Sequence, residues 1–154
     1  MAGTIDARLA ELGIELPAAS APAANYVPCV RTGNLLYVSG QVPMMDGKLQ
    51  YVGRCGAEYG VEEGQACARI CALNILAQAK AALGTLDAVT RVVKVNGYVN
   101  TTPDFPDHPK VVNGASDLFA EVFGDAGRHA RAAVGVANLP FGVAVEVEAV
   151  LEVA

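Results

Sequence analysis

The sequence predicts an α+β domain in which two helices cover one face of a mixed β-sheet. Two observations carry this prediction. Residues 61–83 and 110–124 are long segments with the spacing of small and apolar residues that is typical of helices. Shorter valine-rich segments with strand character lie before, between and after these two helices. A chain of 154 residues is long enough for one substantial core, so we expect a single domain over residues 1–154.

The N-terminal part predicts a short helix, a connector and a hairpin. An apolar stripe that ends before Gly13 indicates an amphipathic helix over residues 4–12. The proline-containing stretch ELPAASAPAANYVP that follows is expected to be an extended connector. Gly33 and Asn34 then lie between two apolar runs, which is the pattern of a β-hairpin turn.

The central part predicts a buried helix and a strand with one uncovered face. Gly84 follows the helix over residues 61–83 at the position of a C-terminal cap. The strand over residues 88–100 has mostly valine at its odd positions, which we expect to face the core. Its even positions are expected on the opposite face, and they are Thr90, Val92, Lys94, Asn96, Tyr98 and Asn100. An uncovered sheet face of this mixed character indicates burial against other copies of the chain.

Composition opposes several classes of function. The net charge is −5, and no two basic residues are adjacent, so a surface that binds nucleic acid is not expected. The N-terminus lacks a secretion signal, and no apolar stretch approaches the ~20 residues of a membrane span, so we expect a cytoplasmic protein without a membrane partner. The four cysteines have no clustered histidines, which predicts buried thiols and no metal site. They are Cys29, Cys55, Cys67 and Cys71.

The strand ARAAVGVA carries a candidate anion-binding residue. Alternation places Arg131 on the same face as Ala133, Gly135 and Ala137, and the other face has the pattern of a core. An arginine among small residues suits a ligand carboxylate that is held by two hydrogen bonds. A surface arginine paired with a glutamate explains the same spacing equally well.

The last strand carries a candidate acid or base. It places three glutamates on one face, and the first of them is Glu146. Because the loop NLPFG before this strand is short, we expect the last two strands to pair and to bring Glu146 close to Arg131. A carboxylate there can polarise water, whereas a solvated strand face is the alternative explanation. No nucleophile–histidine pair stands out, and His108 and His129 are expected in solvated loops.

The segments YVSGQVP and RAAVGVANLPFGVAVEVEAV, with the order of elements between them, resemble the Rid family. These are the reactive intermediate deaminases, also called YjgF-like or endoribonuclease L-PSP proteins. The resemblance spans residues 25–154 and leaves the helix over residues 4–12 as an extra element. It implies a chorismate-mutase-like fold, a homotrimer with sites between subunits, and hydrolysis of enamines or imines such as 2-aminoacrylate. The implied partner is a small 2-imino or 2-keto acid, and the implied reaction needs no cofactor.

The resemblance also implies roles for four residues. Arg131 corresponds to the arginine that grips the substrate carboxylate, and Glu146 to the glutamate that positions the attacking water. Tyr26 corresponds to a tyrosine of the pocket wall. Gly40 corresponds to the glycine whose backbone approaches the ligand.

Two further substrate-site candidates are Asn113 and Ala133. Asn113 matches an asparagine that opens the second helix in the family, a place that helix capping explains equally well. Ala133 stands where many members have a cysteine, and together with the stiff loop over residues 100–109 it indicates a divergent subfamily. The expected function is therefore 2-imino acid hydrolysis, and the alternative is a non-catalytic sensor that binds a small carboxylate. A ribonuclease, as the older family label suggests, is opposed by the acidic composition.

Overall fold

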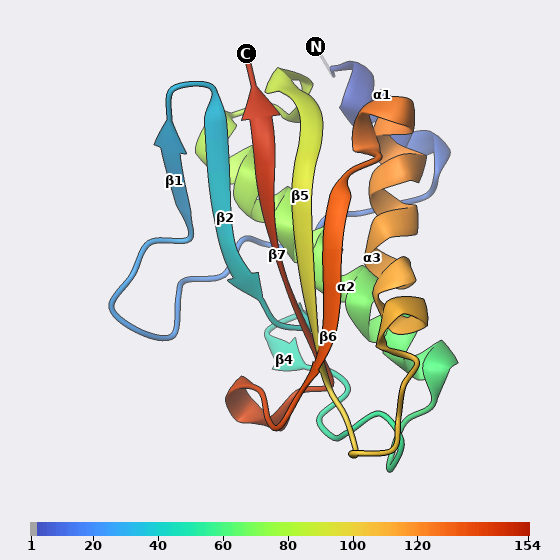
Figure 1. Cartoon of the computed structure of the whole chain (residues 1–154). Coiled ribbons are helices and arrows are strands. Elements are labelled where there is room, and N and C mark those ends of the chain that lie inside the picture. Colours follow the sequence, from blue (N-terminus) through green and yellow to red (C-terminus); the bar gives the residue numbers. More distant parts are fainter. Residues whose placement is uncertain (1–2) are drawn as a thin grey trace.

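The computed structural model describes residues 3–154 and contains a five-stranded sheet with its main helices on one face (Figure 1). The prediction of an α+β domain with a mixed sheet is confirmed. Its elements are, in chain order, α1 (Thr4–Glu11), β1 (Cys29–Thr32), β2 (Leu35–Gln41), β3 (Met44–Met45), β4 (Lys48–Leu49), α2 (Val61–Leu83), η1 (Leu86–Ala88), β5 (Val89–Asn100), α3 (His108–Phe123), η2 (Gly124–Gly127), β6 (Ala130–Val136), η3 (Pro140–Gly142) and β7 (Val145–Val153).

The strands lie in the order β1-β2-β7-β5-β6. All neighbours are antiparallel except β5 and β6, which are parallel and are joined through α3. The expected pairing of the last two strands is therefore wrong. The crossover through α3 places β6 at the edge, while β7 is inserted between β2 and β5. A short connecting loop does not make a hairpin when another strand already occupies the neighbouring place.

Helix α2 fills the space behind the sheet and has the bounds that the sequence predicts. Gly84 ends it in the left-handed conformation, with φ of 82°. Its small side chains permit close packing against the sheet and α3, and Cys67, Cys71 and Ile75 have no exposed surface. Within residues 3–154, α2 is the one helix long and apolar enough to cross a membrane, but 61% of its most apolar window is buried inside the domain. This burial is typical of the core helix of a soluble protein.

The uncovered face of β5 differs from the expectation at two positions. The register against β7 shifts between Val92 and Lys94, and this irregularity turns Val92 into the core, where it is fully buried. Asn100 is also buried, and its Nδ2 donates to the carbonyl oxygen of Val143 at 3.2 Å. Seven side chains of β5, β6 and β7 share the uncovered face of the sheet. They are Lys94, Asn96, Tyr98, Ala132, Val134, Glu146 and Glu148.

The helix expected near the N-terminus is present as α1 and packs beside α3. The N–H groups of Thr4 and Ile5 donate to the carboxylate of Asp87, at 3.0 and 2.8 Å. Arg8 donates to the carbonyl oxygen of Glu121 at 2.9 Å. These bonds attach α1 near the start of β5, at the end of the sheet opposite the start of β7.

Candidate functional site

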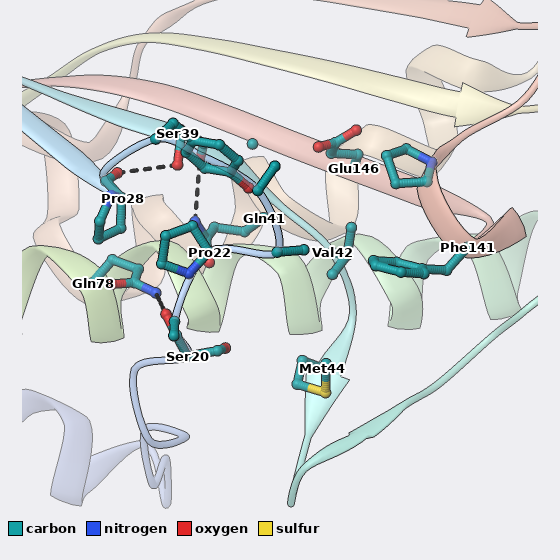
Figure 2. A pocket seen from close by; sticks show the side chains of 16 residues that line it. Ser20, Pro22, Pro28, Ser39, Gln41, Val42, Met44, Gln78, Phe141 and Glu146 are labelled. Atoms are coloured by element: carbon teal, nitrogen blue, oxygen red, sulfur yellow. Dashed lines mark hydrogen bonds between the residues drawn. The ribbon is translucent and has the colours of Figure 1, made fainter.

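A cavity of about 280 Å³ opens between β2, the start of β7 and the connector before β1. Figure 2 shows Glu146 and Phe141 at one end of this cavity and Ser20 and Pro28 at the other. Most of its lining is apolar. The lining residues are Ser20, Ala21, Pro22, Ala23, Ala24, Tyr26, Pro28, Ser39, Gly40, Gln41, Val42, Met44, Gln78, Pro140, Phe141 and Glu146.

Among the described residues, Glu146 is the one carboxylate that lines this cavity, and it is half-buried. Burial raises the pKa of its carboxyl group, and the neighbouring charge of Glu148 raises it further. A carboxyl group with a raised pKa is better suited to take and return a proton than an ordinary glutamate is. Gly40 lies directly against it, and a Cβ at this position would overlap the Glu146 carboxylate. Only glycine therefore leaves room for Glu146 in its present place.

Two buried amides on α2 hold the walls of the cavity. The Nδ2 of Asn74 donates to the carbonyl oxygens of Met44 and Val42, at 2.8 and 3.3 Å. The Nε2 of Gln78 donates to the carbonyl oxygen of Ser20 at 2.7 Å. Both amides are nearly inaccessible, at 1% and 4% exposure. Neither amide was among the residues expected at the site, although two amides four residues apart on an apolar helix face are a visible signal of buried hydrogen bonding.

The mouth of the cavity is formed by aromatic side chains. Tyr26 and Phe141 both line it, with exposed fractions of 48% and 60%. Phe141 has φ of 59°, a left-handed conformation that is unfavourable for a bulky residue. Strain of this kind gathers at ligand sites, and here the strained residue lines the cavity together with Gly40 and Gln41 at the end of β2. Tyr26, Gly40 and Glu146 thus all lie at one cavity.

Arg131 does not lie there. In the parallel ladder Arg131 pairs with Val95, whose side chain is in the core, whereas Glu146 pairs with Tyr98 of the uncovered face. The two candidates therefore lie on opposite faces of the sheet, with β5 between their strands. The expected approach of Arg131 to Glu146 within one chain is wrong.

The predicted faces of β6 are also reversed. Ala133 packs against the core, and Val134, expected in the core, is 44% exposed on the uncovered face. Arg131 follows Ala133 onto the helix-covered side. At this edge α3 covers the strand only in part, so a long polar side chain fits between them.

The guanidinium group of Arg131 is held by neutral acceptors. Its Nη1 donates to Oδ1 of Asn113 at 2.8 Å and to Oγ of Ser116 at 3.2 Å, and its Nη2 donates to the carbonyl oxygen of Pro109 at 3.2 Å. No carboxylate within residues 3–154 forms an ion pair with it. These bonds use three of the five N–H donors of an arginine, so two remain, as many as a bidentate carboxylate accepts.

Asn113 has a different position from the one expected. Helix α3 begins at His108, so Asn113 lies inside the helix and cannot cap it. Its side-chain oxygen instead accepts the shortest hydrogen bond of Arg131.

Among the described residues, no group of three or more histidine, cysteine or acidic side chains is placed to hold a metal ion.

Comparison with known proteins identifies relatives that cover almost the whole chain. A family model described as "YjgF/chorismate mutase-like, putative endoribonuclease" matches residues 6–151. Protein TCP17 of Trypanosoma cruzi is 56% identical over 151 residues, which are 97% of this chain and 94% of that protein. The crystal structure of the protein Atu1372 from Agrobacterium tumefaciens matches with a TM-score of 0.91 and 52% identity, over 97% of this chain and 92% of that one. A 2-iminobutanoate/2-iminopropanoate deaminase of Dermatophagoides farinae is 29% identical over 138 residues, 90% of this chain and 93% of that protein.

Proposed function

Because the chain belongs to the YjgF/chorismate mutase-like family, we propose that it hydrolyses 2-imino acids to 2-keto acids and ammonia. The observation that carries the proposal is a pair of complementary half-sites on one chain. Glu146, with a raised pKa, faces a cavity on one side of the sheet. Arg131, without an acidic partner in the described chain, lies at the edge of the other side. The imine deaminase relative adds support for this class of substrate.

The complete site requires a neighbouring subunit in this proposal. Glu146 of one subunit and Arg131 of the next come together when the uncovered sheet faces associate in a cyclic homotrimer. Tyr37 and Val134 support such association, since they are large apolar side chains exposed on strands of this sheet, at 45% and 44%. In the proposed ring, the edge strand β6 of each subunit lies beside the cavity of its neighbour.

The reaction then needs only water and these two side chains. Arg131 binds the substrate carboxylate and fixes the electrophilic imine carbon near Glu146. Ionised Glu146 accepts a proton from water while the water oxygen bonds to the carbon of the protonated imine, and the C=N electron pair moves to nitrogen, which becomes a neutral amine. The carboxyl group returns the proton to nitrogen, the C–N bond breaks and ammonia leaves. The added hydroxyl loses its proton to the medium and becomes the keto oxygen.

The walls of the cavity favour particular substrates. Val42, Met44 and Phe141 present apolar surface, and within residues 3–154 no lysine or arginine lines this cavity. We therefore place the side chain of the imino acid against these residues and expect apolar side chains to be preferred over acidic ones. A volume of about 280 Å³ accommodates a small or branched aliphatic side chain as well as a water molecule.

The test is an assay in which an amino acid oxidase or a pyridoxal-phosphate lyase generates the imine and its decay and ammonia release are followed. The protein is expected to accelerate decay, while Arg131→Ala and Glu146→Gln lower kcat/KM about 100-fold or more. Arg31→Ala is the matched control, because this arginine is held by the backbone oxygens of Gly33 and Ala154 at the opposite edge of the sheet. No acceleration over spontaneous hydrolysis, or full activity in Arg131→Ala, contradicts the proposal.

A second candidate function is binding without turnover. Ala133 favours it, because this residue gives the site no thiol beside Arg131. Thermal stabilisation by 2-ketobutyrate that depends on Arg131, together with no imine hydrolysis, distinguishes this case. A ribonuclease role has no support from charge, since the chain has net charge −5 and no basic side chain of the described residues lines the cavity beside Glu146.

A further inference from the structure

A second cavity of about 240 Å³ lies on the helix side of β6, and His129 and Arg131 both face it. We expected His129 in a solvated loop, but it is half-buried beneath α3, and its ring meets that of Phe119 edge-on at 5.8 Å. The cavity is separate from the one that contains Glu146. Its lining residues are Ser116, Asp117, Ala120, Arg128, His129 and Arg131.

The hydrogen bonds of His129 determine its tautomer. The Nδ1 atom lies 2.7 Å from the carbonyl oxygen of Gly127, which can only accept, so Nδ1 carries the proton. In the neutral ring Nε2 is then an acceptor, and it lies 2.8 Å from Oγ of Ser116. The hydroxyl proton of Ser116 therefore points to His129.

This direction leaves the lone pairs of Ser116 available to Arg131. The Nη1 atom of Arg131 donates to Ser116 Oγ at 3.2 Å. The bonds thus run in one sense, from Arg131 to Ser116, from Ser116 to His129 and from His129 to Gly127. Each donor in this series meets an acceptor, and none of the four groups carries a negative charge. We call this series of hydrogen bonds the relay.

The surroundings keep His129 neutral. Burial lowers its pKa most, the nearby positive charge of Arg131 lowers it as well, and the hydrogen bond to Gly127 opposes both effects. The other charged groups at this cavity are exposed: Asp117 on α3, and Arg128, which lies 3.6 Å from Asp125 of η2. The acceptor form of Nε2 is therefore the form present at neutral pH.

We propose that Ser116 and His129 are positioning residues that aim the guanidinium group of Arg131 at the carboxylate of the substrate. The inference rests on the proposed function. An arginine on an edge strand loses considerable side-chain entropy when it binds a ligand, unless other groups already hold it. A glutamate would hold it equally well but would neutralise the charge that attracts the substrate. The neutral relay through Ser116 and His129 fixes the geometry and preserves the charge.

The test separates substrate binding from turnover. Ser116→Ala and His129→Gln interrupt the relay at different members, and each is expected to raise KM about 3- to 10-fold with kcat changed less than about twofold. The dissociation constant of 2-ketobutyrate, measured by calorimetry, rises by a similar factor. Ser116→Thr keeps the hydroxyl group and restores both values. In an Arg131→Ala background, Ser116→Ala has no further effect on 2-ketobutyrate binding.

Thr85→Ala is the control for general destabilisation. It removes a hydroxyl group that accepts from the N–H of Asp87 at a distant turn, and it should leave KM unchanged. The inference is overturned if Ser116→Ala and His129→Gln both retain the wild-type KM and 2-ketobutyrate affinity, or if Thr85→Ala raises KM equally. Wild-type activity in Arg131→Ala contradicts the proposed function instead, so the two failures are distinguishable.

Discussion

At the scale of single residues, the charge of Glu146 is opposed by its surroundings. The side chain is partly removed from water, and Glu148 lies two residues away on the same strand face. Glu148 in turn accepts a hydrogen bond from the hydroxyl group of Tyr98, which raises the pKa of Tyr98 to about 12. Glu146 therefore binds a proton more readily than an ordinary glutamate, as a group that must take and return a proton requires.

Glu148→Gln tests the like-charge part of this effect. The amide oxygen of glutamine still accepts from Tyr98, but the negative charge next to Glu146 is removed, so the pKa of Glu146 falls. If ionised Glu146 is the general base, the acidic limb of the pH profile of kcat/KM moves to lower pH in this variant. A limb that stays in place or moves to higher pH contradicts the assignment.

Glu146→Gln is expected to inactivate the protein and also to stabilise it at neutral pH. A carboxyl group whose folded-state pKa exceeds its unfolded value favours folding when protonated, and this contribution is lost as pH rises through the folded pKa. The glutamine variant avoids that loss, so its Tm at pH 7 should exceed that of the wild type by about 2–4 °C. Near pH 4 the difference should shrink. A lower Tm than wild type at pH 7 would show that ionised Glu146 is stabilised in the fold.

At the scale of elements, the close contact between α2 and α3 sets the position of Arg131. Gly114 of α3 lies so close to α2 that a Cβ would overlap the backbone carbonyl group of Gln65. The side chain of Gln65 also donates to the carbonyl oxygen of Lys110 at 2.9 Å. Asn113 and Ser116, which hold Arg131, flank this point of contact.

Gly114→Ala sets two effects against each other. Helix propensity favours alanine over glycine by about 1 kcal/mol, whereas the overlap forces two backbones apart. Because backbone atoms cannot move aside as a side chain can, we expect a net loss of about 1–3 kcal/mol in the free energy of unfolding, measured with urea. Lys110→Ala, at an exposed position of the same helix, should change it by less than about 0.5 kcal/mol. A variant more stable than wild type would refute this packing.

Local patterns predicted the elements better than the faces of the strands. The apolar run closed by Gly84 predicted both ends of α2, since helix periodicity and caps are local. The face of Val92 was not predictable, because a shift of register has no local signature. The orientation of Arg131 was not predictable either, because it depends on α3 crossing over to make β6 an edge strand. The relay through Ser116 joins residues 13 and 15 positions apart, which no spacing rule identifies.

At the scale of the whole molecule, the family is confirmed, while the assembly remains our proposal. The quoted segments around Gly40 and Arg131 were sufficient to identify the family. They also predicted that Tyr26, Gly40 and Glu146 serve one site, and these three residues line one cavity. Within one chain Arg131 lies outside that cavity. Whether it reaches the cavity of a neighbouring copy depends on how copies associate, which local sequence patterns do not predict.

Light scattering during size-exclusion chromatography checks the assembly. The expected mass is three times the 15.9 kDa of one chain. Val134→Lys should lower this mass, because it places a charge on the uncovered face, where Val134 pairs with Tyr98 of β5 and is 44% exposed. A wild-type monomer would contradict the proposed trimer, and a Val134→Lys variant that retains the trimer would show that another surface mediates association.

Mixing two inactive variants tests the central claim most directly. Arg131→Ala and Glu146→Gln subunits are denatured together at equal amounts and refolded, and imine hydrolysis is measured against each variant refolded alone. In a ring whose sites combine Glu146 of one subunit with Arg131 of the next, about a quarter of the sites contain both intact groups, so about a quarter of wild-type activity should return. If the mixed oligomers form and stay as inactive as the separate variants, the two half-sites do not act together and the account is wrong.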